Sequence, residues 1–346
     1  MNADLKPADS PQDVAPSILM ILIDQLTSHG KRCKLNAQFI FFGGKVYSVR
    51  LYLFGAWVVM SKNLTKVEFT NLDKILYPEP RITKAKVIEY YIKMAPKMLD
   101  LMATRPIVLT RYPNGIDKEG FYEKDAPVGT PAWVKTFKTY SETAKRDIRY
   151  IVCNDVDTLM WLANLAALEI HVPLSRMDSY QSPDLILFDM DPEPPANIDS
   201  VVDVAMLLKE RLDTIGLRSY VKTSGKKGLH VVLPIAKGHT FRQTRDFVHK
   251  MGRDLAKESK IIVSEASRSK APGTVFVDYA QNSHGKTMIC AYSLRITPQA
   301  TVSTPLEWKA VKKGLKPEEF NIFSVPRIEE SPWKRLLEDR QKLEAE

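Results

Sequence analysis

Three aspartates stand at the ends of two apolar segments. Asp189 and Asp191 follow the run LILF, and Asp278 follows TVFV. Side chains at positions i and i+2 of a strand share a face, so Asp189 and Asp191 converge. Like charges at the end of a buried strand are costly unless a divalent cation neutralises them, and Mg²⁺ and Mn²⁺ prefer carboxylate oxygens. A metal site including Asp278 is expected if the two strands are neighbours. The alternative is a solvated turn leading to Pro192.

A turn between two predicted strands, KTSGKKGLH, holds several hydrogen-bond donors. Gly225 and Gly228 permit close approach of the backbone to an anion, while Ser224, Lys227 and His230 can donate to phosphate oxygens. The turn is not a Walker loop, because no GxxxxGK[ST] motif precedes a helix. The alternative is a basic hairpin tip on the surface.

Other candidates lie outside this turn. Arg295 follows a later strand, where it could clamp a triphosphate or lie on the surface, and His171 in EIHVP could belong to the site or to the core. The first half of the chain combines cations with aromatic residues, as single-strand stacking platforms do: Lys74, Lys84, Arg111, Phe121 and Tyr122. Solvated lysines and core aromatics are the alternative there.

Helices and strands alternate along the chain and must position these residues. Apolar spacing predicts a helix behind Thr83, a credible N-cap, and a second helix that runs into a strand ended by Pro173. A helix closed by Gly216 follows the Asp-Met-Asp strand, and another helix follows the glycine turn. Beyond residue 305 the sequence predicts a charged helical segment.

Composition limits the class of protein. The 346 residues exceed the usual size of one core, and 44% hydrophobic residues predict a folded globular chain. Fifty Lys and Arg against 41 Asp and Glu leave a net charge of +9, which makes a polyanionic partner plausible. The three cysteines are widely separated, which argues against a disulfide scaffold or a structural zinc site and favours a reducing cytoplasm.

Residues 1–59 differ from the rest. Their opening is polar, and each of two later apolar patches is about half the roughly 20 residues that a spanning helix needs, so no transmembrane segment is expected. Regular element signals begin after Met60. We therefore expect residues 1–59 to be an extension, either disordered or an artefact of start-site choice, with an extra hairpin or strand pair as the alternative.

The ordered motifs resemble a known family. DMD, TSGKKGLHV and FVDYAQN occur in the order typical of the archaeo-eukaryotic primase superfamily. NLDKILYP, RYPNGI, ALEIHVP and PLEW extend the resemblance over residues 66 to 308, most closely to the polymerase domain of bacterial ligase D and its stand-alone relatives. Those proteins fill and extend broken ends in non-homologous end joining.

The resemblance implies an α+β fold with two modules, an N-terminal α/β module and a catalytic sheet like that of an RNA-recognition motif. The catalytic domain would span residues 60–346, with the N-terminal module at 60–175, the sheet module at 176–304 and the helical segment at 305–346. The implied activity is template-directed, primer-dependent nucleotidyl transfer at DNA gaps and ends with NTP or dNTP, with ribonucleotides favoured.

The resemblance also implies roles for individual residues. Two divalent ions, Mn²⁺ or Mg²⁺, would be held by Asp189, Asp191 and Asp278. The incoming nucleotide would be bound by Ser224, Lys227, His230, Arg295, Gln281 and His171. A downstream DNA 5′-phosphate would be held by Lys74 and Lys84, and template bases would stack on Phe121 and Tyr122. Thr110 departs from the family, since some relatives have a basic residue there.

No KxDG ligase motif is found, so we expect a free-standing polymerase of the cytoplasm, associated with the nucleoid. A separate DNA ligase and a Ku-type end-binding protein are the implied partners, and no membrane is involved. Three alternatives stay open: a primase that starts strands without a primer, a non-catalytic module that bridges DNA ends, and a DxD glycosyltransferase that uses a nucleotide sugar.

Overall fold

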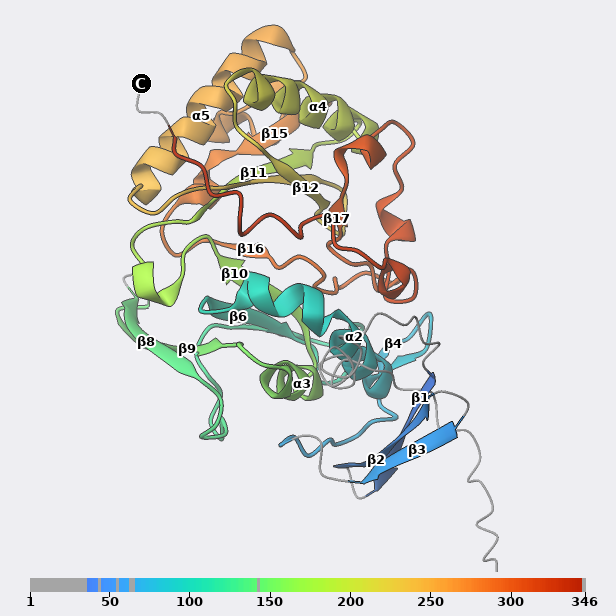
Figure 1. The fold of residues 1–346 in the computed structure, drawn as a ribbon. Coiled ribbons are helices and arrows are strands. Elements are labelled where there is room, and N and C mark those ends of the chain that lie inside the picture. Colours follow the sequence, from blue (N-terminus) through green and yellow to red (C-terminus); the bar gives the residue numbers. More distant parts are fainter. Residues whose placement is uncertain (1–35, 43–44, 54–55, 62–65, 142–143, 344–346) are drawn as a thin grey trace, which may run out of the picture.

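The computed structural model describes residues 36–42, 45–53, 56–61, 66–141 and 144–343. Two six-stranded sheets dominate this part of the chain (Figure 1). The first sheet has the order β16-β10-β6-β9-β8, with β7 paired to β6, and the second has the order β14-β15-β11-β13-β12-β17. Every pairing is antiparallel except that of β14 with β15. This architecture is the α+β, two-module fold that the sequence predicts.

The strands come from separate parts of the chain. Those of the first sheet are β6 (Pro106–Arg111), β7 (Phe121–Glu123), β8 (Thr136–Ser141), β9 (Arg146–Val152), β10 (Ala167–Pro173) and β16 (Thr287–Ile289). Those of the second sheet are β11 (Leu185–Pro192), β12 (Tyr220–Thr223), β13 (Leu229–Pro234), β14 (Ile262–Val263), β15 (Val275–Asp278) and β17 (Pro305–Leu306). The chain thus returns to the first sheet with β16 after it has built most of the second.

Four helices flank the sheets: α2 (Lys84–Met102), α3 (Val156–Asn164), α4 (Ile198–Thr214) and α5 (Phe241–Glu258). Figure 1 shows α4 and α5 on the outer side of the second sheet, whereas α2 and α3 lie against the first sheet. Two buried clusters fill these layers: one packs β11 and β13 against α4 and α5, and the other joins α2, α3 and the first sheet. No helix in the described part of the chain has the length and apolar character to cross a bilayer.

Strand β11 shows how the alternation sets the two faces. Ile186, Phe188 and Met190 belong to the cluster beneath α4 and α5, whereas Leu185 and Leu187 belong to the cluster on the other side. Continued alternation puts the aspartates at 189 and 191 on the face that carries Leu185 and Leu187. They therefore lie on the side of the second sheet turned toward the first sheet.

Local signals place the helix ends where the sequence predicts them. The Thr83 side chain caps α2 by accepting a hydrogen bond from the backbone N–H of Lys86. After α4, Gly216 adopts a φ of +74°, a conformation that glycine reaches without steric cost. Both predicted helix boundaries are confirmed.

The prediction of a helical segment at residues 305–346 is wrong. Among the described residues of this segment, only strand β17 and the short 3₁₀ turns η4 (Trp308–Ala310), η5 (Pro317–Glu319) and η6 (Val325–Arg327) form. Proline recurs at 305, 317, 326 and 332. Proline lacks an amide hydrogen and restricts the residue before it, so these prolines interrupt helix formation between residues 305 and 332.

Three strands precede the two large sheets, β1 (Asn36–Phe42), β2 (Lys45–Leu53) and β3 (Ala56–Ser61), and they form an antiparallel sheet of their own. This is one strand more than the pair weighed above, and β3 crosses the boundary set at residue 60. Residues 1–35 lie outside the described residues. A short hairpin, β4 (Ile75–Tyr77) with β5 (Ile82–Thr83), leads into α2.

Candidate active site

The three aspartates meet because β11 and β15 are neighbours. Asp189 lies directly opposite Asp278 in the antiparallel register, and Asp191 lies opposite Phe276. Asp189 and Asp278 are half-buried, whereas Asp191 reaches solvent. We call this group of three carboxylates the aspartate site.

Two of the three carboxylates of the aspartate site, Asp191 and Asp278, have a raised pKa. Burial, then the negative charge of Asp189 and, less strongly, that of Asp278 raise the pKa of Asp191 to about 6. Burial is the main cause of the raised pKa of Asp278. Burial would also raise the pKa of Asp189, but His230, Lys222 and Arg295 lower it below its usual value. A cation placed between the carboxylates would relieve this repulsion.

The donor set fits a cation that is only partly held by protein. Asp189 Oδ1 lies 3.1 Å from His230 Nε2, and Asp278 Oδ1 accepts a hydrogen bond from the backbone of Ala280. In the described part of the chain, no three His, Cys, Asp or Glu side chains form a ready-made metal cluster. Mg²⁺ is commonly bound through one or two carboxylates, with waters and substrate phosphates as its other ligands. The aspartate site fits that mode.

The glycine turn between β12 and β13 lies against the aspartate strand. A Cβ on Gly228 would lie 2.3 Å from the backbone oxygen of Met190 and 3.3 Å from Asp191 Oδ1. Gly225 has a φ of +76°, and a Cβ there would lie 2.5 Å from Arg295 Cγ. Glycine is therefore required at both positions, and the turn is held close to Asp191 and Arg295.

Donors in this turn face different partners. The Ser224 hydroxyl oxygen accepts the backbone N–H groups of Lys226 and Gly228, which leaves its proton free to donate. Lys227 is exposed, and its Nζ lies 3.1 Å from the Pro192 carbonyl oxygen at the end of β11. His230 is buried on β13 opposite Asp189. All three candidates therefore lie around the aspartate site.

Sequence reasoning missed Glu169, which joins several of the nucleotide-site candidates. Its carboxylate lies 3.1 Å from Arg295 Nε, 3.4 Å from His171 Nε2 and 4.0 Å from Lys226 Nζ. Burial would raise the pKa of Glu169, but His171, Arg295 and Lys226 lower it to about 2. Glu169 and His171 share a face of β10 by alternation, and this i+2 spacing is the signal that could have identified it.

Arg295 keeps donor capacity despite this ion pair. Its Nε is buried and makes no hydrogen bond of suitable geometry, although Glu169 Oε1 is close. Gln281 lies half-buried in η3 (Tyr279–Asn282), directly after Asp278. Arg295 and His171 thus share Glu169 as a partner, and Gln281 lies in the turn that follows Asp278.

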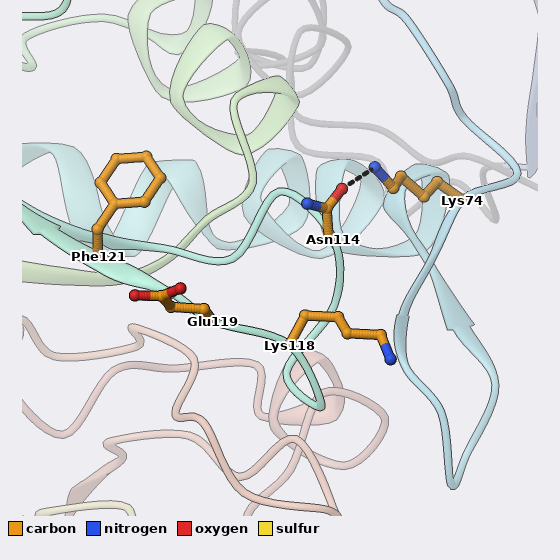
Figure 2. Close-up of a pocket in the computed structure, with 6 residues that line it drawn as sticks. Lys74, Asn114, Lys118, Glu119 and Phe121 are labelled. Atoms are coloured by element: carbon orange, nitrogen blue, oxygen red, sulfur yellow. Dashed lines mark hydrogen bonds between the residues drawn. The ribbon is translucent and has the colours of Figure 1, made fainter.

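A second region, about 540 Å³ in volume, lies near the start of α2 and is lined by Lys74, Asn114, Lys118, Glu119, Gly120 and Phe121 (Figure 2). We call it the basic pocket. Lys74 Nζ donates a 2.7 Å hydrogen bond to Asn114 Oδ1, which fixes the ammonium group at one end of the pocket. Figure 2 shows Phe121 at the opposite end. Asn114 was not singled out in the sequence, although it lies in the motif RYPNGI.

Lys84 lies behind the basic pocket rather than in its lining. Its backbone N–H donates to the carbonyl of Lys74, and its side chain is only 6% exposed. Burial lowers the pKa of Lys84, and the charges of Lys74 and Arg111 lower it further. Three cations gathered in this way favour an anionic ligand.

The two aromatics that the sequence paired point to different regions. Phe121 and Tyr122 alternate on β7, with 44% and 53% of their surfaces exposed, so each offers a ring face to solvent. The guanidinium of Arg111 lies 5.0 Å from the ring of Phe121, beside the basic pocket. The ring of Tyr122 lies 6.1 Å from that of His171. Strand β7 therefore separates the basic pocket from the nucleotide-site candidates.

Carboxylates on neighbouring strands beside a glycine turn rich in hydrogen-bond donors suit the transfer of a nucleotidyl group. The family model for the LigD primase-polymerase domain matches residues 83–333. The chain belongs to this family, which makes it a polymerase-type nucleotidyltransferase.

Named relatives agree with this assignment. The bifunctional non-homologous end joining protein LigD of Bacillus subtilis is 34% identical over 262 residues, or 75% of this chain and 42% of the relative. The multifunctional LigD of Mycolicibacterium smegmatis is 34% identical over 71% of this chain and 32% of its own length. The chain thus spans less than half the length of these relatives.

A solved structure is similar over nearly its whole length. The polymerase domain of Mycobacterium tuberculosis ligase D, in complex with DNA, has a TM-score of 0.73 and 30% sequence identity to this chain. The match covers 80% of this chain and 99% of the other. The two-module fold described above is therefore that of a ligase D polymerase domain.

Proposed function

We propose that this protein is a template-directed, primer-dependent polymerase that fills gaps and extends ends during non-homologous end joining. The observation that carries the proposal is the register of β11 and β15, which sets Asp189 opposite Asp278 beside the glycine turn. Family membership and the DNA-bound relative support the choice of DNA as template.

Asp189, Asp191 and Asp278 would hold two divalent ions, Mn²⁺ or Mg²⁺. Bound there, the ions would ease deprotonation of the primer 3′-hydroxyl and offset charge on the phosphates. Burial, followed by repulsion from Asp189, raises the pKa of Asp191 and Asp278, and this supports the assignment because the carboxylates are kept together at a cost.

The chain's own donors would hold the incoming triphosphate. Ser224 offers its hydroxyl proton, Lys227 its exposed ammonium group and Arg295 a guanidinium with an unused Nε donor. Gln281 and His171 would complete the nucleotide site. We extend the proposal to a preference for ribonucleotides, which the family resemblance implies.

The basic pocket would bind the 5′-phosphate on the downstream side of a gap. Lys74 supplies an exposed cation held by Asn114, and buried Lys84 adds positive charge behind it. Phe121 and Tyr122 would stack on template bases on either side of β7. A Ku-type end-binding protein, a separate DNA ligase and a cytoplasmic, nucleoid-associated location follow from the same proposal.

The competing functions make different demands on the site. A primase that starts strands without a primer has no need of a 5′-phosphate pocket, and a non-catalytic bridging module has no need of three mutually repelling carboxylates. A nucleotide-sugar glycosyltransferase does not account for the basic pocket.

Extension of a labelled primer across a short gap tests the proposal. We expect extension that depends on primer, template and Mn²⁺ and is lost in Asp278→Asn, with ribonucleotides used better than deoxyribonucleotides. The matched control is Asp203→Asn, because Asp203 is an exposed aspartate on α4 that pairs with Lys313. This variant should extend the primer as wild type does. Synthesis without a primer would favour a primase. DNA binding without extension under any metal or nucleotide would favour the bridging module.

A further inference from the structure

A lysine with no assigned role lies buried in the second sheet. Lys222, on β12, has none of its surface exposed, and burial followed by the charge of Arg295 lowers its pKa to about 7. A buried amine is costly unless its hydrogen bonds are made. Its Nζ lies 2.9 Å from His230 Nδ1 and 2.6 Å from Ser303 Oγ.

Donors and acceptors fix the direction of these bonds. The Ser303 hydroxyl donates to the carbonyl of Thr223 at 2.8 Å, so its oxygen accepts from Lys222. The charged lysine ammonium has three N–H donors and no acceptor, so Lys222 donates in both of these hydrogen bonds. His230 Nδ1 is then the acceptor, and the ring proton lies on Nε2.

The fixed tautomer aims one donor at the aspartate site. His230 Nε2 lies 3.1 Å from Asp189 Oδ1, and the two residues are paired across β11 and β13. The Nε2–H therefore donates to one oxygen of Asp189 and holds the carboxylate in a defined rotation. A histidine with its proton on Nδ1 would instead turn a lone pair toward this negatively charged oxygen.

We propose that Lys222 is a positioning residue for polymerisation: it holds His230 as the Nε2–H tautomer, which in turn orients the Asp189 carboxylate. The inference deepens the proposed function, because it concerns the same site. Outer partners of metal-site ligands act in this way in other proteins, and their loss typically costs about 10–100-fold in metal affinity or activity.

The direct test is the tautomer of His230 in metal-free protein without DNA or nucleotide, read by NMR of ¹⁵N-labelled histidine. The chain has six histidines, and His230→Gln identifies the signal to follow. We expect wild type to show Nε2–H alone. Lys222→Met, which keeps the length but removes the donor, should show a mixture with Nδ1–H, and Lys222→Gln, which keeps an N–H donor, should retain more of the Nε2–H form.

Kinetics supply the second readout. We expect Lys222→Met to lower kcat by about 10–100-fold with little change in KM for DNA, and to weaken Mn²⁺ binding measured by titration. In a His230→Gln background the same substitution should have little further effect on kcat, because Lys222 acts through His230.

An unchanged tautomer in Lys222→Met, or fully additive losses in the double variant, would overturn the proposal. Lys222→Gln provides the same readings if Lys222→Met does not fold. An inactive wild type in which the tautomer still depends on Lys222 would overturn the proposed function and with it the role of Lys222 in polymerisation, while the control of the His230 tautomer by Lys222 would stand.

Discussion

The aspartate site and the basic pocket differ in how the chain builds them. The aspartates stand on neighbouring strands, where the register sets Asp189 opposite Asp278 and the glycine turn packs against β11. The basic pocket is lined by Lys74, from the segment before β4, by residues of the loop between β6 and β7, and by the first residue of β7. Groups on rigid strands suit chemistry that tolerates little displacement, whereas loop residues suit recognition of a substrate end.

Among substitutions that leave the aspartates in place, the largest effect should come from the backbone contact beneath them. Gly228→Ala places a Cβ 2.3 Å from the Met190 oxygen, so β11 or β13 must shift. We expect extension to fall by about 100-fold, because a displacement near 1 Å at reacting groups has that cost. Stability should fall by about 1–3 kcal/mol, as overpacking does. Primer extension and thermal unfolding measure the two effects.

Gly314→Ala is the control for Gly228→Ala. Gly314 has a φ of +80° with nothing within 4 Å of an added Cβ, so the substitution strains the backbone without touching the site. It should lose stability and keep full extension per folded molecule. Equal loss of extension in both variants would contradict the claim that the contact between Gly228 and Met190 positions the aspartates.

Glu169 should make the stability of the protein depend on pH. Its folded pKa of about 2 lies below the usual value of 4.5, so it contributes stability above about pH 4.5 that is lost as the pH falls toward 2. At most about 3 kcal/mol is involved. Acid titration of the free energy of unfolding should show this step in wild type and a smaller one in Glu169→Gln. Identical acid limbs would mean that the ion pairs with Arg295 and His171 contribute nothing.

The smallest effects should separate the two aromatics of β7. Phe121→Leu should reduce the preference for gaps with a 5′-phosphate, and Tyr122→Leu should raise KM for the nucleotide, each by roughly 5-fold, since base–aromatic stacking contributes about 1–3 kcal/mol. Gap-filling kinetics on matched substrates measure both parameters. If both variants change the same parameter, β7 does not separate the basic pocket from the nucleotide site.

Features that depend on neighbouring residues could be predicted from the sequence, whereas contacts between distant parts of the chain could not. The Asp-Met-Asp strand, the glycine turn and the Thr83 cap depend on short-range patterns, and the structure has each of them. Glu169 and Lys222 were missed because their partners, Arg295 and Ser303, lie far along the chain and meet them only through tertiary packing. Local patterns carry no record of these contacts, and the one local signal was the i+2 spacing of Glu169 and His171 on β10.

One wrong prediction has a local cause. The segment after residue 305 was predicted to be a charged helical segment, while its repeated prolines argue for turns. The template-stacking role of Phe121 and Tyr122 stays a prediction, and the structure adds that these adjacent residues of β7 point to opposite faces.

The central claim is that the aspartate site performs the chemistry and the basic pocket selects the DNA end. Gap extension on paired substrates, with a 5′-phosphate or a 5′-hydroxyl downstream, tests it in wild type, Asp189→Asn and Lys74→Ala. The account predicts no extension of either substrate by Asp189→Asn. It predicts that Lys74→Ala extends the 5′-hydroxyl substrate like wild type and loses about 10-fold on the phosphorylated one, the scale of a charged hydrogen bond. Extension by Asp189→Asn, or equal losses on both substrates in Lys74→Ala, would contradict it.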